Sequence, residues 1–442
     1  MTGCVAVPSV AITPDPYPRK NSAREKVCRE VSQLQCTDFC ATDSQHEVYS
    51  PALLTNRSLI GNPVYSSPIV VVASRQLSSL VLTLQSLVHQ PGIHAPSVLV
   101  VYASSQGQGQ PVNRSATLKG PRRGQGHSSS DYATVINLFS FQAVPVNVSS
   151  DDTKDYIEKG VETAKERFPN KKYVIVIEQG VLVSPDFLHY MAQMVSVLEK
   201  DTTILAISAW NPNGYVNVSS NPYVAYRSTD RPQYAFMVPI QAFNSNKHTH
   251  NCPKQFHRES TSNSSSEGDE IIYPEVSRAL IRPLDIILSG NEQFHHHLDI
   301  PRSTNIDPAV WIENPAGMIL DRYLQHINAL LNESRQLVIS EEDIASCASN
   351  VHLSHLLASD GGNHSTIAIY YREQRSGEHA VLRDLASSCF GLRLTPSETG
   401  KPPPGFFRGM LRFSFNNRHV MLIESGSYFY KQKQSIVENK FL

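Results

Sequence analysis

A single carboxylate stands at a point where this chain is placed to bind a charged ligand. Residues 173–177 form an unbroken apolar run, which predicts a strand buried on both faces of a sheet. Glu178, Gln179 and Gly180 follow directly. Open α/β sheets bind ligands at the carboxyl ends of their strands, where carboxylate and amide oxygens hold divalent cations. The turn therefore predicts a ligand site with one carboxylate, one amide and one residue without a side chain.

Histidine and cysteine offer two further metal hypotheses. The run 295–297 is three consecutive histidines, which cannot all face one ion from a strand or a helix, so a surface run is the better interpretation. Cys36 and Cys40 have a spacing that zinc tolerates, but no second Cys or His pair follows, and a disulfide is favoured. Seven cysteines leave one thiol free or bonded to another chain; they are Cys4, Cys28, Cys36, Cys40, Cys252, Cys347 and Cys389.

Composition excludes some classes of function and favours a secreted environment. With 39 basic and 40 acidic residues in 442, no global field attracts nucleic acid or anionic lipid. No run approaches the ~20 apolar residues of a membrane span, and residues 1–18 do not resemble a signal peptide. We expect a lumenal protein whose anchor or signal is missing from this chain. Glycosylation acceptors support this expectation, and they are Asn56, Asn113, Asn147, Asn217, Asn263, Asn332 and Asn363.

The turn at Glu178 must be positioned by a sheet, and apolar periodicity predicts the elements of an α/β unit. Strands and helices alternate, which indicates βαβ units and a mostly parallel sheet covered by helices on both faces. Asp151 or Asp152 is expected to cap one helix and Pro185 to lie near the start of another. The predicted strands are 69–73, 98–102, 173–177 and 204–210, and apolar side chains recur at helical spacing over 77–88, 157–168 and 188–198.

A smaller α+β domain is predicted to follow. It contains a helix over 316–330, a strand over 366–371, a helix near 378–388 and strands over 410–415 and 419–424. Asn416 and Asn417 between the last two strands predict a tight hairpin, because Asn tolerates positive φ. The expected division is a polar, Cys-containing stem over 1–62, a first domain over 63–305, a second over 306–433 and a tail over 434–442, with flexible segments at 104–130 and 244–269.

Several motifs carry a family resemblance. Trp210 and Asn211 end the run Ile-Ser-Ala-Trp-Asn, followed by Gly214 and Tyr215. With these motifs the chain resembles the β-1,2-N-acetylglucosaminyltransferases of the N-acetylglucosaminyltransferase I type, over roughly residues 64–433. The C-terminal stretch is similar to the enzymes of this family that act on protein O-linked mannose. The other matching positions are 68–74, Glu178, Asp186, Phe187, Pro222, Tyr226, Arg227 and 274–278, with Cys389, 406–409 and 427–430 in the C-terminal stretch.

The resemblance implies a GT-A, Rossmann-like fold that binds UDP-N-acetylglucosamine (UDP-GlcNAc) and Mn²⁺ and transfers the sugar with inversion to O2 of a mannose. The cation offsets charge on the leaving diphosphate. The family's acidic triplet falls on Glu178, Gln179 and Gly180, so its last carboxylate, the metal ligand, is absent. A charge contact at ~4 Å is worth about 4 kcal/mol at an effective dielectric of 20, so metal binding should be severely weakened.

The family's catalytic base and uridine contacts have also changed. The base lies in a segment rich in Trp and Asp, whereas residues 252–268 contain neither, which leaves His257 and Glu259 as weak candidates. Ser74 and Arg75 follow the first strand, and Arg75 is equally well read as a uridine contact or as a solvated residue at a helix start. The remaining substrate-binding candidates are Glu178, Gln179, Gly180, Trp210, Asn211 and Gly214, with Trp210 placed in the wall of the site rather than simply in the core.

Two functions follow. The first is a Golgi transferase that moves GlcNAc from UDP-GlcNAc to O-linked mannose on glycoproteins through a degenerate metal and base site. The second is a catalytically inactive lumenal relative that binds glycans or forms complexes. A metal-independent transferase would need basic residues in place of the cation, and Lys171 and Lys172 lie at the wrong end of their strand.

Overall fold

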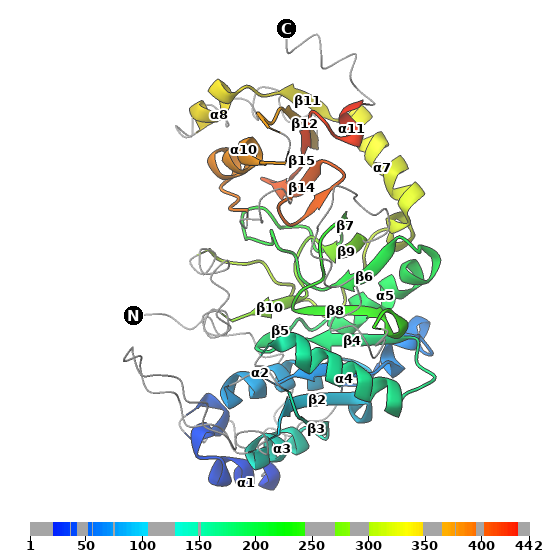
Figure 1. Ribbon diagram of the computed structural model, residues 1–442, viewed down its shortest axis with the longest axis vertical. Coiled ribbons are helices and arrows are strands. Elements are labelled where there is room, and N and C mark those ends of the chain that lie inside the picture. The colour runs from blue at the N-terminus through cyan, green and yellow to red at the C-terminus, as the bar shows by residue number, and fades with distance from the viewer. Residues whose placement is uncertain are drawn as a thin grey trace.

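The computed structural model describes residues 21–431 apart from 36, 42–51, 55, 74–75, 105–128, 149–151, 244–269, 283–299, 348–364, 376 and 395–401. It contains an eight-stranded sheet and a five-stranded sheet, seen one above the other in Figure 1. Short 3₁₀ turns connect many elements; they are Ser32–Leu34, Asp38–Cys40, Arg57–Leu59, Pro63–Ser66, Ala95–Ser97, Ile240–Ala242 and Pro315–Met318.

The eight-stranded sheet contains both parallel and antiparallel strand pairs. Its strand order is β3-β2-β1-β4-β8-β6-β9-β7. The first four strands in that order are parallel, whereas β8 runs antiparallel to both β4 and β6. The pair β6 and β9 is also parallel, so four of the seven neighbouring pairs agree with the predicted mostly parallel sheet, and β8 and β7 are the strands that depart from it. The strands are β1 (Ile69–Val72), β2 (Val98–Ala103), β3 (Gln142–Val146), β4 (Tyr173–Ile177), β6 (Ile204–Ser208), β7 (Ala225–Ser228), β8 (Ala235–Pro239) and β9 (Glu270–Pro274).

Helices cover both faces of this sheet, because successive residues of its parallel strands point to opposite sides and both sides are apolar. Val71 packs in one core cluster and Val70 in another. The helix α4 (Thr153–Arg167) covers the Val70 face, with Asp152 capping it by accepting from the Lys154 amide, as predicted. A Cβ added at Gly160 of this helix would lie 2.4 Å from Val70 Cγ1, so α4 packs closely on β1. The opposite face is covered by α2 (Leu77–Val88), α3 (Ser129–Leu138) and α5 (Phe187–Lys200).

The described part of the predicted stem over 21–41 is folded onto the first sheet. It forms α1 (Ser22–Glu30), which packs against α3 and places Val27 in the core of the first sheet. Cys28 and Cys40 are joined in a disulfide. This bond confirms that the segment is stapled, and it overturns the zinc hypothesis, since the sulfur of Cys40 is consumed by the bond.

The second sheet has the order β11-β12-β15-β14-β13. Its hairpin turn places Asn416 and Asn417 at φ 50° and 60°, which confirms the predicted tight turn. A disulfide between Cys347 and Cys389 ties two of its helices together. The elements are β11 (Arg335–Val338), β12 (Thr366–Tyr371), β13 (Phe406–Phe407), β14 (Met410–Phe415), β15 (Arg418–Glu424), α7 (Leu320–Glu333), α8 (Glu341–Cys347), α10 (Ala380–Phe390) and α11 (Tyr428–Lys431).

The two sheets meet at their edges. The Thr229 amide, just after β7, donates to the Phe406 carbonyl of β13 at 3.1 Å. The core of the first sheet continues across this boundary into Phe407 and Met410. The division into domains at residue 305 stays a prediction. A small ribbon of β5 (Val181–Val183) and antiparallel β10 (Ala279–Ile281) lies at the edge that carries Glu178.

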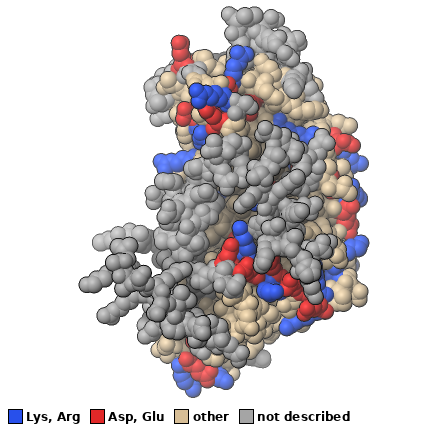
Figure 2. Space-filling view, in the orientation of Figure 1, with Lys and Arg blue, Asp and Glu red and all other residues tan. Residues whose placement is uncertain are grey.

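The surface shown in Figure 2 carries acidic and basic side chains side by side over its described part, in keeping with the near-zero net charge. None of the helices in the described ranges is long and apolar enough to cross a membrane. The predicted flexible segment over 244–269 and most of that over 104–130 fall outside the described residues, as do the histidines at 295–297.

Candidate active site at the carboxyl edge of the first sheet

Glu178 is held by the main chain at the end of β4. Its own amide donates to the Tyr234 carbonyl at 2.7 Å, and the Tyr234 amide donates back to Glu178 Oε1 at 2.8 Å. Burial raises the pKa of Glu178 to about 7; the nearby Asp152 charge adds to the rise, and the Tyr234 hydrogen bond opposes it. The carboxyl group is therefore partly protonated near neutral pH, and one of its oxygens is already engaged.

The other two residues of the turn supply little to a cation. Gln179 Nε2 donates to Thr153 Oγ1 at 3.4 Å, and Gly180 occupies a left-handed conformation with φ 72°. Within the described ranges no three His, Cys, Asp or Glu side chains come together as a metal site. The donor set at this turn is one half-buried carboxyl group with a raised pKa and one amide, and it does not fit the Mn²⁺ that the family resemblance implies.

Trp210 forms a wall beside this turn. It follows β6, and its ring meets the Tyr234 ring edge-on with centroids 4.7 Å apart. β8 lies between β4 and β6 and runs antiparallel to both. Its first end therefore meets the last ends of β4 and β6, which brings Glu178, Tyr234 and Trp210 to one edge of the sheet. The Ser208 hydroxyl, 3.1 Å from both the amide and the carbonyl of Trp210, fixes the chain at this point.

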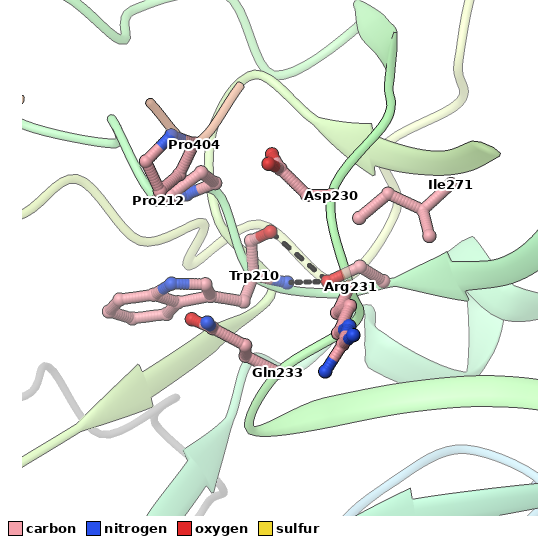
Figure 3. Close-up of a pocket in the computed structure, with 8 residues that line it drawn as sticks. Trp210, Pro212, Asp230, Arg231, Gln233, Ile271 and Pro404 are labelled. Carbon is pink, nitrogen blue, oxygen red and sulfur yellow. Dashed lines mark hydrogen bonds between the residues drawn. The ribbon is translucent and has the colours of Figure 1, made fainter. Parts of the chain in front are cut away.

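A small cavity opens against Trp210 (Figure 3). Its volume is ≈ 50 Å³, enough for a few waters or for one end of a ligand. Asp230 reaches it from the chain after β7, with Oδ2 accepting from the Ser228 hydroxyl and the Gly405 amide. Burial raises the pKa of Asp230 to about 6. The lining residues are Ser208, Trp210, Pro212, Asp230, Arg231, Gln233, Ile271 and Pro404.

Asn211 and Gly214, two predicted substrate-binding residues, have clear packing roles. Asn211 Nδ2 donates to the Glu275 carbonyl at 2.5 Å, and its Oδ1 accepts from the Asn213 amide at 2.8 Å. A Cβ at Gly214 would lie 3.0 Å from Ser277 Oγ, so a side chain there would press on its neighbour. Both residues hold the loop after β6 against the chain after β9.

The remaining residues of the family motifs form a buried polar network. Arg278 Nε pairs with Asp186 Oδ2 at 2.9 Å, and both side chains are fully buried. Glu275 accepts from the amides of residues 220 and 221 and from the Tyr226 hydroxyl. Arg227 pairs with Asp201 and Glu270. These contacts join β7, β9 and α5, so the motifs report on how the sheet is held together.

The structure thus brings Glu178, Gln179, Gly180 and Trp210 to one edge of the sheet. Ser74, Arg75, His257 and Glu259 lie outside the described residues. Sequence reasoning missed three residues of this edge, which are Asp230, Tyr234 and Arg302. For Asp230 a signal was present, since a Ser-Thr-Asp turn directly follows the Tyr226-Arg227 motif.

Comparison with known proteins shows a similarity between the part of the chain that builds this site and one family. Residues 162–345, which include β4, β6 to β9 and the Trp210 loop, match the GNT-I family. The match covers less than half of the chain, and it shows that this part of the chain is similar to the GNT-I family. The GT-A-type fold expected from the resemblance accords with the α/β sheet described above.

One curated relative also matches. It is the alpha-1,3-mannosyl-glycoprotein 2-beta-N-acetylglucosaminyltransferase of Arabidopsis thaliana, 37% identical over 65 residues. The match spans 15% of this chain and 15% of the relative. It supports the similarity to this family and leaves the activity of the whole chain to be argued from the site.

Proposed function

We propose that this protein is an N-acetylglucosaminyltransferase of the GNT-I type that uses UDP-GlcNAc and acts on O-linked mannose of glycoproteins in the Golgi lumen. The observation that carries the proposal is the coincidence of two findings. The family match covers residues 162–345, and the same stretch contributes Glu178, which Tyr234 joins to Trp210, and Asp230, which lines the cavity against Trp210. The C-terminal resemblance to the O-mannose enzymes supports the acceptor, and the glycosylation acceptors support the compartment.

Asp230 is the carboxylate best placed to act as the base. Transfer requires that the acceptor hydroxyl lose its proton as its oxygen attacks the anomeric carbon and UDP leaves. Asp230 lines the cavity beside Trp210 and lies in the matched region. A pKa of about 6, raised by burial, lets this carboxylate take a proton near neutral pH. We therefore propose Asp230 as the base instead of His257 and Glu259.

The test is turnover of UDP-GlcNAc with mannosyl peptides, with and without Mn²⁺, by the wild type, Asp230→Asn and the control Asp321→Asn. Asp321 is an exposed residue of α7. We expect kcat to fall roughly 10²- to 10⁴-fold in Asp230→Asn, the range of general-base catalysis, and to stay unchanged in the control. Equal kcat in all three proteins would remove Asp230 from the mechanism, and no turnover by the wild type would contradict the transferase proposal.

A non-catalytic role is the second candidate, favoured by the state of the Glu178 turn. Glu178 is half-buried and accepts a hydrogen bond from the Tyr234 amide, and Gly180 stands where the family has its metal ligand. A lumenal relative that binds glycans or forms complexes needs the scaffold but no charge-stabilising site. Calorimetric titration of UDP-GlcNAc separates the two candidates, because absence of binding with and without Mn²⁺ favours the non-catalytic role.

A further inference from the structure

Arg302 occupies a fixed position beside the Trp210 wall. Its segment is bonded to the loop after β6, with the Ser303 amide donating to the Gly214 carbonyl at 2.9 Å. Arg302 itself forms a β-bridge with Tyr215. Residues almost ninety apart in the chain are therefore held side by side, and the Arg302 side chain leaves a backbone that is anchored on a neighbour.

The guanidinium group is packed between two rings. It lies 4.0 Å from the Trp210 ring centroid and 4.6 Å from that of Tyr215. Nη2 donates to the carbonyls of Asn211 and Pro212, at 2.5 and 3.0 Å. Nε is buried with no hydrogen-bond partner, although the residue as a whole is partly exposed. The side chain of Arg302 is thus held by two aromatic rings, its Nε–H group has no acceptor, and part of the residue is accessible to a ligand.

This cation lacks a counter-ion among the described residues. Arg227 and Arg278, which are fully buried, each pair with one or two carboxylates. No described carboxylate lies within ion-pair distance of Arg302, and burial lowers its pKa. Arg412 also has no described carboxylate, but it bonds Tyr323 and His419 and touches no residue of the cavity. Arg302 is therefore a desolvated positive charge that an anionic ligand would complete.

The location points to the anion. Trp210 and Pro212, both in contact with Arg302, line the cavity. Glu178 and Trp210 end strands that are two positions apart in the sheet, and strands lie ~4.8 Å apart, so their backbones are about 10 Å from each other. A diphosphate bound at this edge would thus be within the reach of Arg302.

We propose that Arg302 binds the diphosphate of the nucleotide sugar and supplies positive charge that the Glu178 turn does not gather through a metal ion. This inference rests on the proposed function for the identity of the ligand. The anion-binding property itself is carried by the seat between two rings, the missing counter-ion and the contact with the cavity wall. Arg302 would thus neutralise charge on the diphosphate, a role that the family resemblance gives to Mn²⁺.

The experiment is calorimetric titration of inorganic pyrophosphate, and separately of UDP-GlcNAc, into the full chain in EDTA. The wild type is compared with Arg302→Gln, Arg302→Lys and the control Arg322→Gln, which changes an exposed arginine of α7. We expect both ligands to bind the wild type without metal. Arg302→Gln should bind roughly 30-fold more weakly or worse, Arg302→Lys should lose less, and the control should match the wild type. Circular dichroism and thermal melting verify that each variant is folded, and if Arg302→Gln does not fold, Arg302→Lys against the control carries the test.

The outcomes separate this inference from the proposed function. Equal pyrophosphate affinity in the wild type and in the folded Arg302 variants, or no pyrophosphate binding by the wild type, would overturn the anion role of Arg302. Turnover that persists with Mn²⁺ in that case would leave the transferase proposal standing. Conversely, pyrophosphate binding that depends on Arg302, without any binding of UDP-GlcNAc, would support the anion site and contradict the transferase proposal.

Discussion

The family motifs and the Glu178 turn lie close together but have different physical roles. In the motif network every charge has a partner, as in the fully buried pair of Arg278 and Asp186 at 2.9 Å. At the turn, Glu178 is half-buried with a raised pKa and no cation beside it within the described structure. The network holds β7, β9 and α5 together, whereas the turn lies at the edge of the sheet and joins few other elements.

This difference explains how a chain can keep a family's motifs and still have an altered site. Trp210 apart, the motif residues of the described structure satisfy backbone and side-chain groups in the interior, so losing them would damage the fold. Residues 178–180 contribute one main-chain pairing and little else. The motifs are thus informative about fold, and the charges at the edge are informative about chemistry.

The largest effect should come from the motif network. Arg278→Met leaves the Asp186 carboxylate buried without its cation, which should lower the free energy of unfolding by about 3–5 kcal/mol. Guanidinium denaturation at pH 7 measures the change. A loss below about 1 kcal/mol would show that the pair is not structural, and the distinction drawn between network and turn would then fail.

Glu178→Gln should have a smaller effect whose sign depends on pH. The pKa of Glu178 rises from 4.5 to about 7 on folding, so the native state holds more protons than the unfolded state between these values. Wild-type stability therefore falls as the pH rises through this window, by roughly 1–3 kcal/mol. Gln retains the acceptor for the Tyr234 amide and carries no charge.

Denaturation at pH 4.5 and at pH 8 tests this prediction. The variant should match the wild type at the lower pH and exceed it by roughly 1–3 kcal/mol at the higher pH. Taking the difference between the two proteins removes the contribution of other titrating groups. A variant that is less stable than the wild type at pH 8 would show that the ionised carboxylate is stabilised by a partner and does not destabilise the folded state.

Gly180→Asp should restore a cation ligand to the turn. The position has φ 72°, which Asp tolerates better than most residues, and the new carboxylate would join Glu178. We expect the affinity for Mn²⁺, measured by calorimetry, to rise roughly tenfold or more. Gly180→Asn is the matched control, because it has the same shape without the charge. Equal affinities of the Asp and Asn variants would mean that the missing carboxylate is not what limits metal binding.

The smallest effect is expected at an exposed ion pair. Arg375 lies 3.3 Å from Glu378, with 81% of its side chain accessible. Because solvent screens this pair, Arg375→Ala should change stability by less than about 0.5 kcal/mol. The same denaturation assay provides the baseline for Arg278→Met. A loss comparable to that of Arg278→Met would show that burial is not what distinguishes the motif network.

The parts of the fold that depend on local sequence were predictable. Apolar runs identified β1, β2, β4 and β6, helical spacing identified α2, α4 and α5, and the Asn pair identified the hairpin between β14 and β15. Not every strand was found: the apolar run of β8 was missed, and other missed strands contain polar residues or proline. β3 begins with Gln142 and contains Pro145. β7 contains Arg227, and a charged residue argues against a buried strand unless its ion-pair partners are known.

The sequence by itself determined where most buried strands and helices lie, that Glu178 ends one of them, and that the turn after it has lost carboxylates. These properties are encoded by neighbouring residues, through burial periodicity and capping. Only the tertiary structure decided that β8 runs antiparallel between β4 and β6, that Tyr234 engages Glu178, and that Arg302 is seated on Trp210. Those contacts join residues 28 to 92 positions apart, and no local pattern specifies which distant strands pair or which charges remain without a partner.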